Sequence, residues 1–442
     1  MHHRPAAPLR GTLATLLALA FSAGPALAQS DKLSDLEAKI DALDSQLKDL
    51  KRQQEQVKAA APAEGQAVTG GATPGSFRLP GSRTSVTLGG YAKLDAIYSS
   101  RSAGVAQQGD QFLFPSQIPV GAAAGANERE QVTLHARQSR FFFRTSTPSA
   151  WGEVTSLVEG DFFGADGNES VSNSHALRLR HAYGSVGNLS GGQFWTNFLN
   201  EAAYAETLDF GGPVGQIFVR QAQVRWTQPF AGGDWSVSAE NPESVVALPG
   251  SATLFRADDD KLPDFTARVR FNTGVGRYSL QALIRNIRAD SAAAPAVAAQ
   301  KSGGAIGIAG IVPTFGQDDF RFNVNAGNVI GRYQELGFFA DGIVNTAGEI
   351  ELADVVSGYA AYRHFWAPGL RSSLVVSAAR AKNPTGSFGG LNRRSESAHL
   401  NLIWSPDPKV NLGAEYIHAK RVVEDDRSGS LNRLQLSAQY SF

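Results

Sequence analysis

The chain ends in LNRLQLSAQYSF, and its last ten residues alternate polar and apolar side chains without a break. The apolar series begins at Leu434 and ends on Phe442, and a polar residue follows each of its members up to Ser441. A period of two is typical of a β-strand whose two faces meet different surroundings. The same period recurs from residue 84 onward. It predicts sixteen strands, at 84–98, 132–146, 153–163, 174–187, 190–197, 217–228, 235–242, 262–272, 277–288, 302–313, 319–330, 353–366, 370–382, 394–405, 409–420 and 431–442.

Two kinds of connection alternate between these strands. Seven are short and turn-like, among them VGN, NTGVG and PDP, and eight are long and polar, such as 99–131 and 331–352. Strict alternation places all the short turns at one end of a sheet and all the long loops at the other, which is typical of outer-membrane barrels. We therefore predict an all-β fold, a 16-stranded antiparallel transmembrane β-barrel preceded by an N-terminal α-helical coiled coil. A soluble sandwich or propeller has no reason to alternate its loop lengths.

Tryptophan gives an independent indication of the membrane boundary. Five of the six Trp residues lie beside predicted short turns, and Trp195 is the exception. The five are Trp151, Trp226, Trp235, Trp366 and Trp404. Trp prefers the membrane interface, where its ring is buried and its N–H stays hydrated, so these five predict an aromatic girdle on the periplasmic side.

Three segments precede the barrel, which we assign to residues 77–442. Residues 1–28 have the form of a secretory signal peptide, because Arg4 and Arg10 come before the apolar run TLATLLALAF and ALA at 26–28 has the small-x-small form of a cleavage site. Residues 59–76 are rich in Pro, Gly and Ala and predict a flexible linker.

Between the signal and the linker, residues 29–58 carry a heptad pattern. Apolar residues recur at alternating three- and four-residue steps from Leu33 to Val57, and only Gln54 interrupts them. A stripe this narrow favours a coiled coil that associates with itself over a helix that lies on another surface.

Charge and rare residue types exclude several chemistries. With 41 basic and 41 acidic residues, the chain has no global charge that would recruit nucleic acid. Without cysteine it has no disulfide and no thiolate metal site, its histidines lack metal-ligand spacing, and we expect no metal and no cofactor. The string LSGGQ at 189–193 matches an ABC ATPase signature, but no P-loop accompanies it. The acidic strings at 161–170 and 258–260 lack EF-hand spacing and predict solvated outer loops.

In a membrane barrel the apolar face of each strand meets lipid and the polar face meets the lumen. This rule turns arginines inward: in FTARVRF, Phe265 and Phe271 face lipid while Arg268 and Arg270 face the lumen. The predicted lumenal arginines are Arg140, Arg144, Arg178, Arg180, Arg225, Arg268, Arg270 and Arg285. Such a wall concentrates anions, and the alternative is that the arginines pair with acids and only stiffen the interior.

The third long loop carries acidic residues of its own. Glu201, Glu206 and Asp209 lie in LNEAAYAETLDFGGPVG. In large porins the loop after the fifth strand commonly folds into the lumen and sets the bore. We therefore expect the constriction to lie between this loop and the arginine wall.

Several strings resemble one family. TSVTLGGYAKLDAIY, RQSRFFFRTSTP, EGDFFG, LRLRHAYG, GQFWTNF, ETLDFGGP, RQAQVRWT and AYRHFW are similar to the DcaP-like outer-membrane porins. The resemblance implies a homotrimer of barrels in the outer membrane, a coiled coil in the periplasm, and a channel that prefers small anions, notably dicarboxylates. Arg140, Arg144, Arg178, Arg180 and Arg225 lie inside the matching strings, whereas Arg268, Arg270 and Arg285 depend on the alternation alone.

These observations predict a passive porin and not an enzyme. Its expected partners are other copies of itself, small anionic solutes, outer-membrane lipid with lipopolysaccharide, and the barrel-assembly machinery. We interpret Phe442 as the insertion signal that this machinery reads.

Three other functions compete with an anion-preferring channel. The barrel could anchor a coiled coil that tethers the membrane to the cell wall, or it could be an unselective general diffusion porin. A third possibility is a hydrolase at the barrel rim, for which His399 near Ser395 and Ser397 is the local candidate.

Overall fold

The computed structural model describes residues 27–60, 69–101, 110–126, 130–164, 172–173, 175–257, 260–291 and 297–442. The chain forms two compact units, residues 1–68 and 69–442. Most of the predicted signal segment, part of the predicted linker, and most of the two acidic strings lie outside the described residues. Within the described residues, no helix combines the length and the apolar character needed to cross a membrane.

The first unit contains one long helix, α1 (Leu27–Ala60). Its sequence contains neither Pro nor Gly and is rich in residues with high helix propensity. The apolar heptad residues whose side chains the structure describes are exposed in the single chain: Leu36, Ile40, Leu43, Leu47 and Leu50. The predicted helix is therefore confirmed, and its association with other copies stays a prediction.

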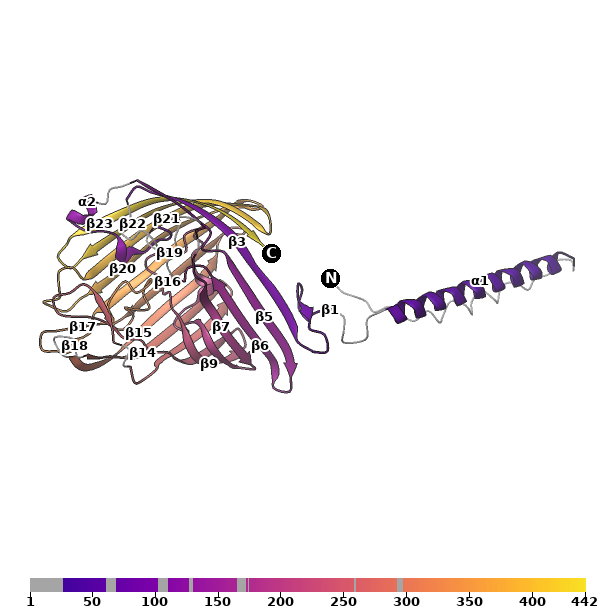
Figure 1. Ribbon diagram of the computed structural model, residues 1–442, viewed down its shortest axis with the longest axis horizontal. Helices are drawn as coiled ribbons and strands as arrows, with labels where there is room; N and C mark the ends of the chain where they lie inside the picture. Colours follow the sequence, from indigo (N-terminus) through magenta and orange to yellow (C-terminus); the bar gives the residue numbers. More distant parts are fainter. Residues whose placement is uncertain are drawn as a thin grey trace. The chain divides into compact units, whose positions relative to one another are not determined.

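The second unit is a closed antiparallel β-barrel of sixteen strands, with β4 and β5 counted as one interrupted strand. The strands are β3 (Ser85–Ser99), β4 (Gln131–His135) with β5 (Arg140–Ser149), β6 (Gly152–Asp161), β7 (Arg178–Val186), β8 (Leu189–Trp195), β9 (Arg220–Phe230), β10 (Gly233–Glu240), β13 (Asp264–Thr273), β14 (Gly276–Ser291), β15 (Val297–Pro313), β16 (Asp319–Gly327), β19 (Asp354–Ala367), β20 (Leu370–Lys382), β21 (Asn392–Asp407), β22 (Val410–Val423) and β23 (Ser428–Ser441). Figure 1 shows β3 and β23, from opposite ends of the colour scale, lying side by side. Their pairing closes the sheet and confirms the predicted fold class.

Smaller elements lie before the barrel and in its loops. The short strands β1 (Thr69–Gly70) and β2 (Phe77–Arg78) pair with each other and lead into β3. Three single-turn or short helices are η1 (Pro115–Gln117), α2 (Ala122–Ala126) and η2 (Glu201–Ala203). The strands β11 (Val245–Ala247), β12 (Leu254–Arg256), β17 (Gly342–Val344) and β18 (Ile350–Glu351) form a separate four-stranded sheet.

Two predictions differ from the structure beyond small shifts at strand ends. The predicted strand 132–146 is interrupted by a turn, in which the Ser139 N–H donates to the Ala136 carbonyl at 3.0 Å. The predicted loop 289–301 is largely paired, since β14 and β15 continue to the pair Ser291–Val297. A polar composition indicates exposure to solvent, but hydrogen bonds between neighbouring strands can continue beyond the membrane. Polarity alone therefore overestimates the length of this loop.

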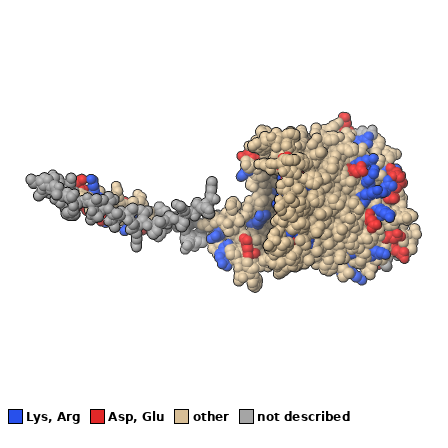
Figure 2. All heavy atoms as spheres, turned by 180° about the vertical axis from the view of Figure 1, so that it is seen from behind, with Lys and Arg blue, Asp and Glu red and all other residues tan. Residues whose placement is uncertain are grey.

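The outward faces of the strands are apolar and exposed, as predicted. Figure 2 shows that charged residues are rare across the middle of the barrel and gather at its ends. The five Trp residues beside the short turns are all exposed, whereas Trp195 packs inside against Tyr204 and Phe218. Phe442 is also exposed, and its N–H donates to the Gly90 carbonyl at 3.1 Å.

The largest buried apolar cluster lies between the barrel wall and its loops, and two loops supply most of its loop residues. We call residues 196–219, between β8 and β9, the third loop, and residues 328–353, between β16 and β19, the sixth loop. Phe198 and Ile217 from the third loop pack in one buried cluster with Tyr333 and Phe338 from the sixth. The core therefore depends on contacts between loops that are more than a hundred residues apart.

The contact between these two loops buries an acid. The Glu335 N–H donates to the Gln216 carbonyl at 3.0 Å, and among the described residues neither side-chain oxygen of Glu335 has a hydrogen-bond partner. Burial raises the pKa of the Glu335 carboxyl well above its ordinary value, and the nearby Asp209 adds to the rise. Burial therefore favours the neutral form of this carboxyl over the ionised form.

The exposed heptad predicts that α1 self-associates. In a peptide of residues 29–58, replacing Ile40 and Leu47 with Lys places charges in the seam, so we expect the peptide to become monomeric. Sedimentation equilibrium measures this. The control is Ser45→Lys, on the opposite face of the heptad, which should leave the assembly intact. Equal association of both variants would contradict the coiled coil.

The buried acid predicts a pH-dependent stability. An acid with a raised pKa favours the folded state at low pH, and this contribution is lost as the pH rises above the pKa of the unfolded chain. Glu335→Gln removes the ionisable group, and with it the free-energy cost that burial imposes on the carboxyl as the pH rises. We therefore expect the variant to unfold roughly 2 °C or more above the wild type at pH 8, with a smaller difference at pH 5. Thermal scans of the detergent-purified protein at both pH values measure this. A difference independent of pH would disprove the assignment.

Candidate functional site: an arginine-lined cavity beside the third loop

The third loop leaves the wall between β8 and β9 and crosses to the opposite wall. Its backbone is held there by side chains of three distant strands. The Tyr359 hydroxyl of β19 donates to the Ala203 carbonyl at 3.0 Å, and the Asn401 amide of β21 donates to the Glu206 carbonyl at 2.8 Å. Lys93 of β3 donates to the Leu208 carbonyl at 2.8 Å. The loop therefore lies inside the barrel, as the sequence predicted for the segment after the fifth strand.

Glycine permits the loop to approach the wall closely. A Cβ atom on Gly215 would lie 2.0 Å from the carbonyl oxygen of Gly358 in β19. No side chain fits there, so the string DFGGPVG brings backbone against backbone at this point.

Glu206, near the middle of the third loop, binds arginines of the opposite wall. The Glu206 carboxylate accepts hydrogen bonds from Arg371 Nη2 at 2.7 Å and Arg371 Nε at 2.9 Å, and lies 3.4 Å from Arg363 Nη1. Glu206 therefore fixes the loop to β19 and β20 at the same time.

Asp209 is buried and its role is local. Its carboxylate accepts hydrogen bonds from the backbone N–H groups of Leu113 at 2.8 Å and Gly212 at 3.0 Å. Burial raises the pKa of Asp209, while Arg433, 3.8 Å away, acts in the opposite direction. Of the three predicted loop acids, only Glu201 is exposed.

Five of the eight predicted arginines surround one cavity beside this loop. The cavity has a volume of about 340 Å³ and is lined by side chains of β5, β6, β7, β8, β9, β13 and the third loop. Its basic residues are Arg140, Arg144, Arg180, Arg225 and Arg268, and its acids are Glu159 and Glu201. We call it the basic cavity. Five guanidinium groups and two carboxylates give its lining a formal charge of +3.

One side of the basic cavity is an ion-pair network. Arg180 binds Glu159 at 2.7 Å and Asp161 at 3.1 Å, and Arg140 lies 3.7 Å from Glu159. Arg178, which does not line the cavity, binds Asp161 through two parallel hydrogen bonds of 2.7 and 2.9 Å. On this side the arginines are largely neutralised and hold the wall together.

The other side has guanidinium groups without a carboxylate. Within the described residues, Arg144, Arg225 and Arg268 have no acidic partner within 4.0 Å. Arg225 donates instead to the Trp195 carbonyl at 2.6 Å and to Gln223 at 2.7 Å, and its guanidinium lies over the Phe194 ring at 4.4 Å. Neutral acceptors and an aromatic face orient these cations without cancelling their charge.

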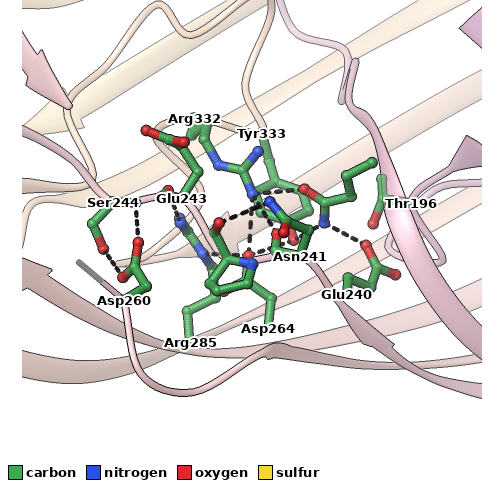
Figure 3. A network of polar contacts seen from close by, with 12 residues as sticks. Thr196, Glu240, Asn241, Glu243, Ser244, Asp260, Asp264, Arg285, Arg332 and Tyr333 are labelled. Carbon is green, nitrogen blue, oxygen red and sulfur yellow. Dashed lines mark hydrogen bonds and ion pairs between the residues drawn. The ribbon is translucent and has the colours of Figure 1, made fainter. Parts of the chain in front are cut away.

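The two remaining arginines lie elsewhere. Arg270 binds Asp234 at 2.8 Å beside a separate cavity of about 260 Å³. Arg285 is only 2% exposed and binds Asp264 at 2.9 Å and Asp341 at 2.6 Å. Figure 3 shows the Arg285 network, in which Arg332 and Tyr333 of the sixth loop converge on Asp264. The geometry of Arg285 is that of a structural link between the wall and the sixth loop.

Some basic residues were not singled out from the sequence. Arg220 lies at the start of β9, over the Trp195 ring at 4.5 Å, and within the described part of the chain it has no carboxylate within 4.0 Å. Arg321, Arg363 and Arg371 form a second basic group on the far wall, joined by Asp319 and Glu206. Strand alternation could have found Arg220 and Arg363, which lie in RQAQVRWT and AYRHFW.

The hydrolase candidate has a structural explanation. Ser397, His399 and Glu415 are joined by two hydrogen bonds of 3.2 Å, in the order found in catalytic triads. All three are buried, and the Ser397 hydroxyl already accepts the Val214 N–H at 3.3 Å. Glu415 also accepts the Leu208 N–H at 2.7 Å, so the group anchors the third loop and offers no accessible nucleophile.

Comparison with known proteins places this geometry in a family. A model of the DcaP outer membrane protein family matches residues 21–442. The crystal structure of the outer membrane channel DcaP of Acinetobacter baumannii matches with a TM-score of 0.68 and 24% identity, covering 85% of this chain and 100% of that chain. An anion-selective porin from Comamonas acidovorans matches at 0.53 and 14%, covering 81% and 100%. The trimer form of OmpT from Vibrio cholerae matches at 0.52 and 10%, covering 81% and 99%.

No curated protein matches the chain. The family match spans both units and nearly all of the described residues. The chain belongs to the DcaP outer membrane protein family and is an outer-membrane porin, a channel and not an enzyme.

Proposed function

We propose that this porin conducts small anionic solutes, dicarboxylates among them, past the basic cavity. The observation that carries the proposal is the set of guanidinium groups on Arg144, Arg225 and Arg268, which have no carboxylate within 4.0 Å in the described part of the chain. The chain as a whole is formally neutral, so this local excess is not a consequence of composition.

Arginine suits this role for two reasons. Its planar fork meets a carboxylate with two parallel hydrogen bonds, and its charge persists at any physiological pH. Arg225 is held by a carbonyl, an amide and a ring, so it is oriented before an anion arrives. Conduction also requires that no site binds too tightly, and the nearby Glu159 and Glu201 weaken the hold on an anion.

The arrangement favours solutes with two negative groups. Arg144, Arg225 and Arg268 come from three different strands, β5, β9 and β13, and so present separate cations around one cavity. A dicarboxylate can meet two of them at once, whereas a monocarboxylate meets one. The similarity to an anion-selective porin supports the sign of the selectivity.

We also propose that the channel works as a homotrimer in lipid and lipopolysaccharide, with α1 in the periplasm. The trimer form of a structural neighbour and the exposed heptad of α1 support this assembly. The barrel-assembly machinery would read Phe442, whose side chain is exposed beyond the end of β23. Deletion of residues 29–58 distinguishes the tether from the channel. Lost envelope attachment with unchanged conductance would favour the tether.

Charge removal from the basic cavity should reduce anion selectivity. For Arg144→Ser with Arg225→Ser, we expect the anion-to-cation permeability ratio to fall by about threefold or more, because two cations without acidic partners leave the lumen. The reversal potential of single channels under a KCl gradient measures the ratio.

The matched control removes two basic residues from the outer face of β20, Arg380→Ser with Lys382→Ser, and should leave the ratio unchanged. A wild-type reversal potential of cation-selective sign contradicts the proposal. A potential near zero identifies an unselective general diffusion porin.

A further inference from the structure

Four basic residues lie on the outward face of the barrel near the long-loop ends of β20, β21 and β22. They are Arg380, Lys382, Arg394 and Lys420, and we call them the outer basic patch. Arg380 and Lys382 are exposed and continue the outward series of β20 that includes Leu374 and Val376. The patch therefore faces away from the lumen and takes no part in the basic cavity.

The level of the patch is that of the outer membrane interface. Lys420 follows the exposed Tyr416 by four residues on β22, which is about 13 Å along a strand. Interfacial Tyr residues mark the boundary between hydrocarbon and head groups. The patch thus begins where the apolar band ends and phosphate groups of the outer leaflet begin.

The cations of the patch have few acidic partners. Within the described residues, Arg380, Lys382 and Lys420 have no carboxylate within 4.0 Å, and Arg394 lies 3.3 Å from Glu396. Asp354 is opposite Lys382 in register but makes no ion pair with it. Four cations and these two carboxylates leave a formal charge of +2 on this part of the outer face.

The register adds a second and independent observation. Arg380 stands directly opposite Arg394 in the pairing of β20 with β21. In the register of the described barrel strands it is the one place where two basic side chains face each other in this way. Like charges directly opposite each other destabilise a sheet, unless an anion lies between them.

We propose that the outer basic patch binds the phosphate groups of a phosphorylated glycolipid of the outer leaflet, a lipopolysaccharide. A phosphate accepts paired hydrogen bonds from two guanidinium groups and so removes the repulsion between Arg380 and Arg394. The acyl chains of the same molecule then lie against the exposed apolar residues below, among them Val376 and Leu400. A free phosphate would meet the charge but not this apolar surface.

The test titrates the detergent-purified full chain with bisphosphorylated lipid A and counts bound lipid by native mass spectrometry. For Arg380→Ser with Lys382→Ser, we expect apparent affinity to fall by about fivefold or more, because each exposed charge contact contributes a modest share. The matched control is Arg144→Ser with Arg225→Ser, which removes the same charge from the lumen and should bind as the wild type does. Heat-modifiable migration on gels confirms that both variants fold.

Two further arms identify the source of the phosphate. We call Arg380→Ser with Lys382→Ser the outer variant. Lipid A without its two phosphates should bind the wild type only as weakly as intact lipid A binds the outer variant. Inorganic phosphate at equal concentration should not displace intact lipid A from the wild type. Equal binding of intact lipid by the outer variant, or of phosphate-free lipid by the wild type, overturns the proposal. So does loss of the oligomer in the outer variant without loss of lipid, since the patch would then be a subunit contact.

Discussion

Backbone hydrogen bonds between β23 and β3 close the barrel, and every other part of the protein is built on this closed sheet. In a bilayer every backbone N–H and C=O must find a partner within the protein, because no water is available to replace it. A sheet meets this requirement only when its last strand pairs with its first, and here that pairing runs to the pair Ser441–Tyr91. Closure then separates the two faces of every strand, one toward lipid and one toward water, and so determines where charge can be placed.

The enclosed interior is polar, and the protein fills part of it with two loops. The third and sixth loops supply their own apolar core, in which Phe198 and Tyr333 pack together. Glu206 and the buried Glu415 fix the third loop against the far wall through Arg371 and the Leu208 N–H. Arginines near acids therefore hold the structure together. Arg144, Arg225 and Arg268 have no acidic partner in the described part of the chain, and they are the ones that we propose to meet a solute.

The strand alternation was enough to predict the sixteen strands and the inward direction of their arginines. Local pattern assigns a side chain to a face, and this is correct for Arg268 and Arg270 alike. It does not say which acid an arginine meets, because that depends on residues distant in sequence. Arg270 meets Asp234 on the neighbouring strand, and Arg285 meets Asp341 from the sixth loop. The pairing of Asp209 with backbone groups of Leu113 and Gly212 was equally out of reach, because it requires the folded loop.

We propose that anions occupy the basic cavity on the side of Arg144, Arg225 and Arg268. A crystal structure of the protein with 2,3-dibromosuccinate tests it most directly, since bromine can be located by its anomalous scattering. We expect a bromine peak inside the basic cavity, with carboxylate oxygens at hydrogen-bond distance from at least two of these guanidinium groups. Bromine peaks elsewhere in the lumen with an empty basic cavity would contradict it.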